Sequence, residues 1–83
     1  MSWTVYILEC ADATLYTGIA KELARRLKDH ESGKGAKYTK GRGPLKLLYK
    51  EVHTSRGAAL KREAEIKALD RSSKLALVVS HHP

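Results

Sequence analysis

Two short runs of β-branched and aromatic residues open the chain and limit what it can fold into. Residues 3–9 and 15–19 both have the length and the composition of strands. The segment between them, residues 11–14, is Ala-Asp-Ala-Thr, which suits a turn. We therefore expect an antiparallel hairpin over residues 3–19.

The spacing of apolar residues changes after this hairpin. Residues 21–31 follow helical spacing, and Ser32-Gly33 ends the pattern. Residues 32–44 hold four of the six glycines and too few apolar groups to pack, which predicts a loop. Residues 45–53 return to strand composition. Along that strand we expect alternation, with Leu48 and Val52 on one side and Leu47 and Tyr49 on the other.

The rest of the chain is predicted to be helical. Thr54-Ser55 supplies an N-cap for a helix of good helix formers that runs to Leu69. Residues 70–73 are expected to break this helix, and Ser72 or Ser73 would cap a short last helix over 74–79. The order strand, strand, helix, strand, helix, helix predicts an α+β fold with a mainly antiparallel sheet. We expect one domain over residues 1–83, with a core from about 3 to 79 and a polar tail.

The basic residues gather in one part of the chain. The sequence has 16 basic and 9 acidic residues and a formal charge of +7. Residues 21–50 hold ten of the basic and three of the acidic residues, so this block accounts for the whole excess. A block of one sign predicts a polyanionic partner, either nucleic acid or an anionic membrane surface. The longest apolar runs, 5–8 and 75–79, fall far short of the roughly 20 residues that span a bilayer, which favours nucleic acid over a membrane.

The single cysteine and the first residues of the chain indicate where the protein is located. Cys10 is the one cysteine and cannot form an internal disulfide, which fits a reducing cytoplasm. The first four residues lack the basic segment of a signal peptide, so we expect a cytoplasmic protein.

Trp3 is expected to pack in the core or at its rim, with stacking on a nucleobase as the alternative. His53 is expected to cap or to pack.

A carboxylate falls on the apolar side of the longer predicted helix. On a helical wheel Glu63 lies between Leu60 and Ile66, while Arg62 falls among the solvated residues. A carboxylate at the edge of a core costs on the order of several kcal/mol unless it is paired or bound to a metal. Two explanations stay open, an ion pair with Lys67 one turn on or a metal ligand, and the wheel alone favours the ion pair.

The first predicted helix carries a comparable pair. Arg26 and His30 lie four residues apart beside the apolar stripe. They suit a phosphate, because arginine offers a planar fork of donors and histidine exchanges a proton near neutral pH. Long side chains that merely cover the rim of the core explain the pattern slightly better. The chain also has four tyrosines and no phenylalanine, which leaves open whether the phenol oxygens have partners or the rings only pack.

Taken in order, five short segments of the chain resemble the GIY-YIG nuclease family, most closely its small stand-alone bacterial members. The resemblance runs from Trp3 to about Val78 and implies a three-stranded antiparallel sheet flanked by helices. The segments are Val5-Tyr6-Ile7-Leu8, Tyr16-Thr17-Gly18, Arg26-Leu27 with His30, residues 32–39, and Arg62-Glu63 with Ile66-Lys67.

The resemblance also implies an activity, namely hydrolysis of DNA phosphodiester bonds with a divalent ion, Mg²⁺ or Mn²⁺, in DNA repair or recombination. It leaves open which side chain deprotonates the attacking water. Gly18 is expected to permit a tight turn or a close backbone approach between the second strand and the first helix. The catalytic residues that the resemblance implies are Tyr6, Tyr16, Arg26, His30 and Glu63, with Glu63 as the metal ligand.

DNA contacts are expected from the basic block and from a lysine close to the metal ligand. They would follow backbone phosphates without reading bases. Several larger family members place an asparagine near the site, and this chain has no asparagine. Larger relatives choose targets with extra domains, so we expect weak cleavage, a preference for branched or damaged DNA, or dependence on self-association or a protein partner. The alternatives are a non-catalytic nucleic-acid-binding module and a repair-complex adaptor on the same fold. The expected DNA-binding residues are Lys34, Lys37, Tyr38, Lys40, Arg42 and Lys67.

Overall fold

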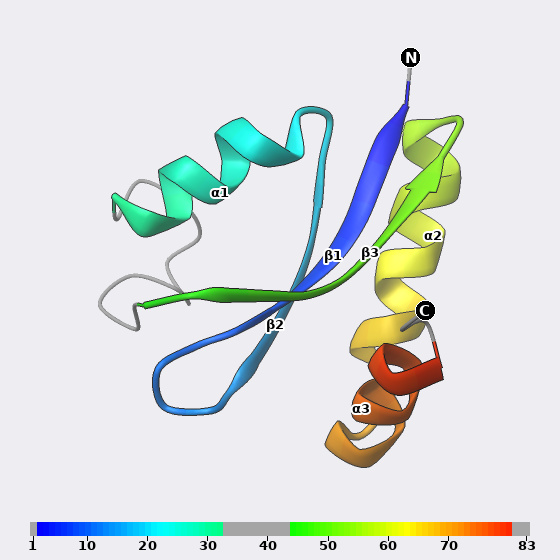
Figure 1. Cartoon of the computed structure of the whole chain (residues 1–83). Coiled ribbons are helices and arrows are strands. Elements are labelled where there is room, and N and C mark those ends of the chain that lie inside the picture. The colour runs from blue at the N-terminus through cyan, green and yellow to red at the C-terminus, as the bar shows by residue number, and fades with distance from the viewer. Residues whose placement is uncertain (1, 33–43, 81–83) are drawn as a thin grey trace.

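In the computed structural model, which describes residues 2–32 and 44–80, strands and helices follow one another in the predicted order (Figure 1). The central part of the glycine-rich loop and the last residues of the tail lie outside the described residues. The elements are β1 (Trp3–Glu9), β2 (Leu15–Ala20), α1 (Leu23–Glu31), β3 (Lys46–His53), α2 (Arg56–Lys67) and α3 (Arg71–Ser80).

The strands form one antiparallel sheet in the order β2-β1-β3. β1 is central, so both of its edges are paired, and helices cover both of its faces; Val5, Tyr6, Ile7 and Leu8 are completely buried. The predicted α+β fold, a three-stranded antiparallel sheet flanked by helices, is confirmed.

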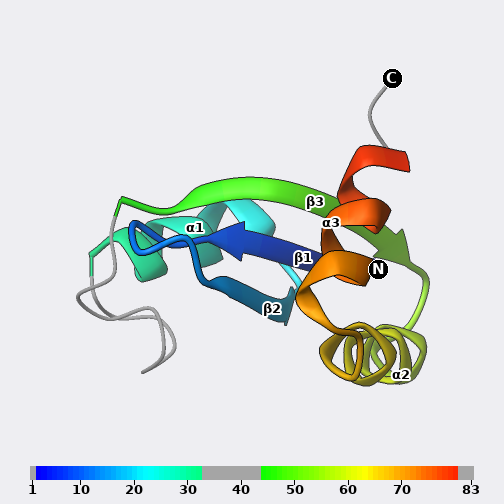
Figure 2. The same cartoon turned by 90° about the horizontal axis from the view of Figure 1, so that it is seen from below.

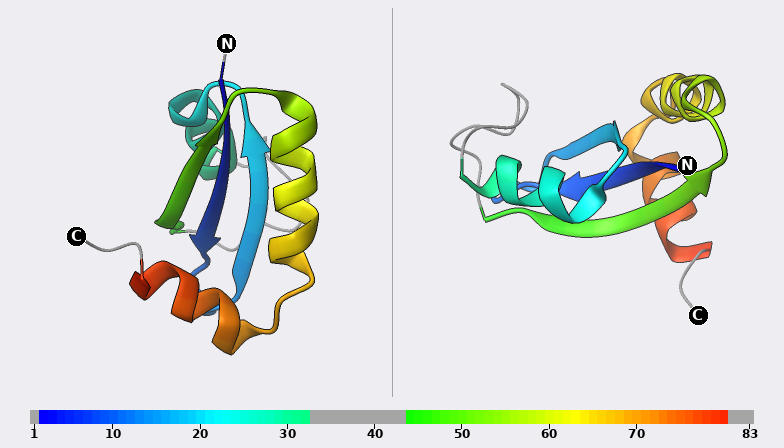
Figure 3. Two further views of the ribbon diagram at one scale, coloured as in Figure 1. Left: turned by 90° about the vertical axis from the view of Figure 1, so that its right-hand side faces the viewer. Right: turned by 90° about the horizontal axis from the view of Figure 1, so that it is seen from above.

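Helices cover the two faces of the sheet from opposite sides. Figures 1 and 2 show α1 on one side and α2 on the other, and in Figure 3 α3 runs across one end of the strands. Val5 and Ile7 face α2 and α3 and pack with Ile66 and Val78; we call this cluster the α2-side core. Alternate residues of a strand point to opposite faces, so Tyr6 and Leu8, which alternate with Val5 and Ile7, pack against α1. That second cluster, the α1-side core, is built on Tyr6, Leu8 and Ala20 with Leu23 and Leu27 of α1.

The predicted turn between β1 and β2 is present. The backbone N–H of Ala13 donates to the Cys10 carbonyl at 2.9 Å, and the Asp12 carboxylate accepts from the Thr14 hydroxyl at 2.6 Å. Ala13 has a φ of 66°, in the left-handed region that non-glycine residues rarely adopt. Arg71 at the start of α3 donates to the Ala13 carbonyl at 2.5 Å, so the turn is tied to the C-terminal helix.

The predicted alternation along β3 is wrong because the strand contains a bulge. Between Tyr49 and Leu47, β3 advances by two residues while β1 advances by one, which leaves Leu48 as an extra residue. Leu48 and Tyr49 therefore both contact the α2-side core. Val52, expected on the same side as Leu48, is 65% exposed.

The cap of α2 is as predicted, whereas the cap of α3 is not. The Ser55 hydroxyl accepts from the backbone N–H of Ala58 at 3.1 Å and starts α2. In α3, Asp70 is the capping residue, since its carboxylate accepts from the backbone N–H of Ser73 at 2.7 Å. Ser72 and Ser73 therefore lie within a helix that begins at residue 71 and is longer than expected. Across the described ranges, no helix is both long enough and apolar enough to cross a membrane.

Replacing the α2 cap tests the account of this helix. Ser55→Ala should lower the free energy of unfolding by about 1 kcal/mol, because an N-terminal backbone donor of α2 loses its acceptor. Ser72→Ala, in the exposed first turn of α3, is the control and should change it by less than about 0.5 kcal/mol. Urea denaturation followed by circular dichroism measures both. Equal losses in the two variants would contradict the assignment of Ser55 as the cap.

Candidate active site

Tyr6 of β1 and His30 of α1 meet inside the α1-side core. The Tyr6 Oη and His30 Nε2 atoms lie 2.9 Å apart, and the residues are 0% and 2% exposed. Burial raises the pKa of Tyr6 to about 12. Burial also lowers the pKa of His30, and the neighbouring Arg26 charge lowers it further. At neutral pH the phenol therefore keeps its proton and the imidazole is neutral, and the Tyr6 hydroxyl donates to Nε2 in the tautomer that carries its proton on Nδ1.

Gly18 of β2 gives the Tyr6 ring its space. It lies directly opposite Tyr6 in the β1–β2 register. A Cβ at this position would lie 2.7 Å from Tyr6 Oη and 3.0 Å from a ring carbon of Tyr16. The expectation of a tight turn here is wrong, because Gly18 lies inside β2. The missing side chain instead lets the phenol of Tyr6 lie across the backbone of the neighbouring strand.

Tyr16 and Arg26 complete the cluster around the phenol. The Tyr16 ring centroid lies 6.4 Å from that of Tyr6 and 5.3 Å from that of His30, and both contacts are tilted or edge-on. The positive charge of Arg26 favours the ionised phenol and so opposes the effect of burial on the Tyr6 pKa. Four of the expected residues thus lie together, one on each of β1 and β2 and two on α1.

Glu63 approaches the same phenol from α2. Its negative charge contributes to the raised pKa of Tyr6, which places it within electrostatic reach. Glu63 is 17% exposed and forms an ion pair with Lys67 at 3.4 Å, the contact that the helical spacing had favoured. Lys67 itself is 54% exposed, and an ion pair with so exposed a partner is weak. The ion pair therefore leaves Glu63 able to bind a cation.

The buried stripe of α2 lies on a different side from the one that the wheel predicted. Its buried residues are Ala59 and Ile66, whereas Leu60 is 36% exposed. Glu63 flanks the stripe on one side, and Arg62, which was expected in solvent, flanks it on the other and is only partly exposed. Glu63 therefore lies at the edge of the helix contact and not at its centre.

The donor chemistry at Glu63 fits a hard divalent ion. In the described part of the chain no three His, Cys, Asp or Glu side chains come together in a way that could hold a metal. A zinc site needs three or four such ligands. Magnesium keeps several of its waters and needs only one or two carboxylates beside substrate oxygens. A lone, partly exposed carboxylate is consistent with Mg²⁺ or Mn²⁺ and not with a closed structural metal site.

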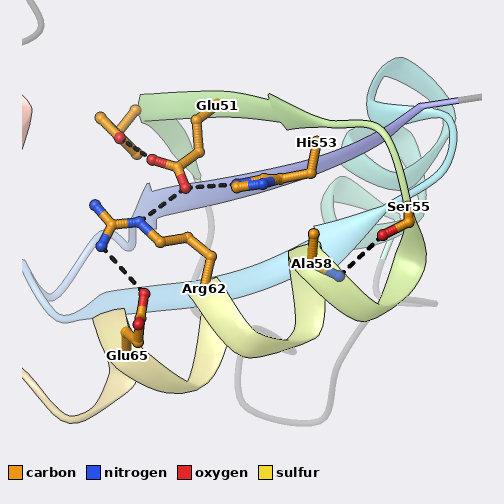
Figure 4. Close-up of polar contacts among 7 residues, drawn as sticks. Glu51, His53, Ser55, Ala58, Arg62 and Glu65 are labelled. Carbon is orange, nitrogen blue, oxygen red and sulfur yellow. Dashed lines mark hydrogen bonds and ion pairs between the residues drawn. The ribbon is translucent and has the colours of Figure 1, made fainter.

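A second polar cluster lies between β3 and α2 and was missed in the sequence (Figure 4). Glu51 Oε1 accepts from His53 Nε2 at 2.7 Å and from Arg62 Nε at 2.9 Å, and Tyr49 donates its hydroxyl to the other carboxylate oxygen. Arg62 also pairs with Glu65 at 3.5 Å. The signal was the spacing of residues 49, 51 and 53, which puts three polar-tipped side chains on one face of a strand. His53 thus binds a carboxylate and does not cap a helix.

This Glu51 cluster anchors α2 next to the candidate metal ligand. Burial raises the pKa of Glu51, but the donors from Tyr49, His53 and Arg62 outweigh it, so the pKa lies below its usual value. Arg62 is the residue directly before Glu63. The ion pair between Glu51 and Arg62 therefore ties α2 to β3 directly beside Glu63.

The remaining expected DNA contacts lie almost entirely outside the described residues. Lys67 is described and pairs with Glu63. The others, Lys34, Lys37, Tyr38, Lys40 and Arg42, fall in the segment that the structure does not describe.

Known proteins resemble this chain over nearly its whole length. The family model of the GIY-YIG catalytic domain matches residues 2–76. A UPF0213 protein of Syntrophus aciditrophicus is 55% identical over 75 residues, which cover 89% of this chain and 86% of that protein. One of Natronomonas pharaonis is 51% identical over 74 residues, with 89% and 87% coverage. The solution NMR structure of the UPF0213 protein BH0048 from Bacillus halodurans has a TM-score of 0.65 and 47% identity, and the match covers 98% of this chain and 86% of that one.

Adding one methyl group at position 18 tests the packing of the phenol. Gly18→Ala should destabilise the protein by about 1–3 kcal/mol, because the new Cβ overlaps Tyr6 and no open space receives it. Gly57→Ala is the matched control, since its Cβ would meet nothing within 4 Å. In helix α2 that change should stabilise by up to about 1 kcal/mol. Opposite signs in thermal and urea unfolding are expected, and equal effects would contradict the close approach at Gly18.

The Glu51 cluster predicts a pH-dependent loss of stability. Glu51→Gln should cost about 2 kcal/mol at neutral pH, because Arg62 and His53 lose their carboxylate. A carboxyl whose pKa is lowered on folding stabilises the protein above its unfolded pKa, and that stabilisation is lost as pH falls through the lower folded value. The gap between wild type and variant should therefore shrink in acid. Glu65→Gln, an exposed partner of the same arginine, should change little at any pH. A gap that stays constant from neutral pH into acid would refute the charged role of Glu51.

Proposed function

Because the chain belongs to the GIY-YIG nuclease family, we propose that it is a divalent-metal-dependent endonuclease that hydrolyses DNA phosphodiester bonds. The single observation that carries the proposal is the buried hydrogen bond between Tyr6 and His30, whose phenol also has its pKa changed by the charges of Arg26 and Glu63. Packing alone would explain the buried pair, but it would not explain why the charges of Arg26 and Glu63 act on the same phenol, and this combination supports the enzyme over a protein that only binds DNA.

Arg26 is the proposed phosphate ligand. It is partly exposed and lies on α1 beside the Tyr6 phenol. A guanidinium at this place can donate two parallel hydrogen bonds to the scissile phosphate. Negative charge builds on the phosphoryl oxygens as water attacks, so the same contact strengthens toward the transition state.

Tyr6 and His30 are the proposed route for the proton of the attacking water. With a pKa of about 12, the phenol cannot by itself be ionised at neutral pH. It can, however, pass its proton to the neutral His30 nitrogen that it already contacts, while its oxygen takes the proton of the water. Arg26 favours the ionised phenol and would lower the cost of this transfer. Tyr16 packs against both rings and holds their orientation.

Glu63 is the proposed ligand of the divalent ion, and Lys67 and the basic segment of residues 34–42 are the proposed contacts to the DNA backbone. When bound, the ion would polarise a phosphoryl oxygen and stabilise the leaving oxygen. Glu63 would hold it by one carboxylate, on the side of the cluster that faces α2. A role in repair or recombination on branched or damaged DNA belongs to the same proposal.

Cleavage of defined DNA substrates tests the proposal. Wild type should cut plasmid, single-stranded or branched DNA with Mg²⁺ or Mn²⁺, and a chelator should stop cleavage. Glu63→Gln should lower the rate at least ~100-fold, since the ion loses its one protein carboxylate. Glu65→Gln, a solvent-exposed carboxylate on the same helix, is the control and should retain the wild-type rate. If wild type and Glu63→Gln give the same background on every DNA, the protein is a binding module or an adaptor and not a nuclease.

A further inference from the structure

A cleft of about 390 Å³ opens beside the candidate active site. Its lining residues come from the start of β1, the end of β2, the connection that follows and α1. The start of β1 and the end of β2 lie at the top of Figure 1. Trp3, Ile19 and Ala20 supply its apolar lining. Its volume falls in the range of about 300–1,000 Å³ that is typical of pockets for small organic groups.

The cleft is continuous with the proposed phosphate ligand. Arg26 lines the cleft, and its charge opposes the rise in the pKa of the Tyr6 phenol, so it belongs to both places. Lys21 and Arg25 supply two further cations to its lining. A DNA strand whose scissile phosphate is bound by Arg26 would therefore have its neighbouring nucleotide at the mouth of this cleft.

The lining is mixed in a way that fits a nucleotide better than a bare phosphate. Beside the cations it includes two carboxylates, Glu22 and Asp29, which would repel a run of phosphates. Carboxylates accept hydrogen bonds from the amino and imino groups of bases. The indole of Trp3 packs against the α2-side core, and the Arg56 guanidinium carbon lies 5.8 Å from its ring centroid; the part of the ring that lines the cleft gives a base an aromatic contact. The cations of the lining match the phosphate attached to that nucleotide.

From this lining we infer that the cleft binds the nucleobase next to the bond that is cut, in an unpaired or flipped-out state. The inference rests on the proposed nuclease function and adds a substrate class to it, DNA with an unpaired nucleotide beside the scissile phosphate. A base in the stacked interior of a duplex cannot enter a cleft, and turning it out costs stacking and pairing energy. Substrates with that base already free should bind more tightly.

Fluorescence of Trp3 gives a direct test, because it is the only tryptophan of the chain. The Glu63→Gln variant, which we expect to bind DNA without cutting it, is titrated with a single-stranded oligonucleotide and with its fully paired duplex. Excitation at the red edge of the tryptophan band avoids the tyrosines. The single strand should quench Trp3 saturably, with an affinity about tenfold higher than that of the duplex. Equal quenching by the duplex, or no change of Trp3 emission while anisotropy of labelled DNA shows binding, would overturn the inference.

Two substitutions on α1 distinguish binding in the cleft from non-specific attraction between cations and the DNA backbone. Arg25 lines the cleft and Lys28 does not, and both are exposed cations of the same helix. In the Glu63→Gln background, Arg25→Ala should weaken single-strand binding about fivefold more than Lys28→Ala and should reduce the Trp3 quenching. Trp3→Leu, followed by anisotropy, should lose about tenfold in affinity for the single strand and little for the duplex. Equal losses for Arg25→Ala and Lys28→Ala would mean that cations act only through the backbone, which contradicts the inference.

Cleavage by the unmodified protein, measured in parallel, keeps this inference apart from the proposed function. Metal-dependent cleavage without Trp3 quenching leaves the nuclease proposal standing and removes the base-binding cleft. Trp3 quenching by single strands without cleavage by the unmodified protein supports the cleft and removes the nuclease.

Discussion

The hydrogen bond between Tyr6 and His30 is the contact on which the rest of the structure depends. It joins the central strand to α1 through two polar groups that are almost wholly buried, and each satisfies a polar atom of the other. The bond is possible only because Gly18 leaves the phenol room to lie across β2. Burial keeps the phenol protonated and the imidazole neutral, so one contact sets both the packing and the acid–base state of the cluster.

The two faces of the central strand differ: most of the candidate catalytic residues lie on the α1 side, and an aliphatic core lies on the α2 side. On the α1 side the buried surface of β1 carries Tyr6 and its aromatic and cationic neighbours. On the α2 side it carries aliphatic residues that α2 and α3 cover. Glu63 is the exception, because it comes from α2 and yet acts on the phenol. The pair of Glu51 and Arg62 one residue earlier fixes α2 against β3, and this explains how a residue at the flank of a helix contact can be held in a defined place.

Much of this fold could be predicted from periodicity. The wrong cap of α3 was a local error, because Asp70 competes with Ser72 and Ser73 within three residues, whereas the other errors have a tertiary cause. The order of elements, the turn at residues 11–14 and the Ser55 cap depend on local spacing and local hydrogen bonds, which the sequence carries. The bulge at Leu48 and the orientation of α2 depend on register and on which partner a helix meets, which no local pattern contains. The same holds at the candidate site. Its residues could be named from a resemblance, but the position of Gly18 under the phenol and the partner of Arg62 emerge only when strands and helices are assembled.

The protonation state of His30 tests the central claim most directly. In a protein labelled with ¹⁵N at histidine, the ring nitrogen shifts report which nitrogen carries the proton. The account predicts a neutral ring at neutral pH, with the proton on Nδ1 and with Nε2 as the acceptor from Tyr6. In Tyr6→Phe the Nε2 signal alone should move strongly, because it loses its donor. An imidazolium at neutral pH, or a proton on Nε2 in the wild type, would contradict the account.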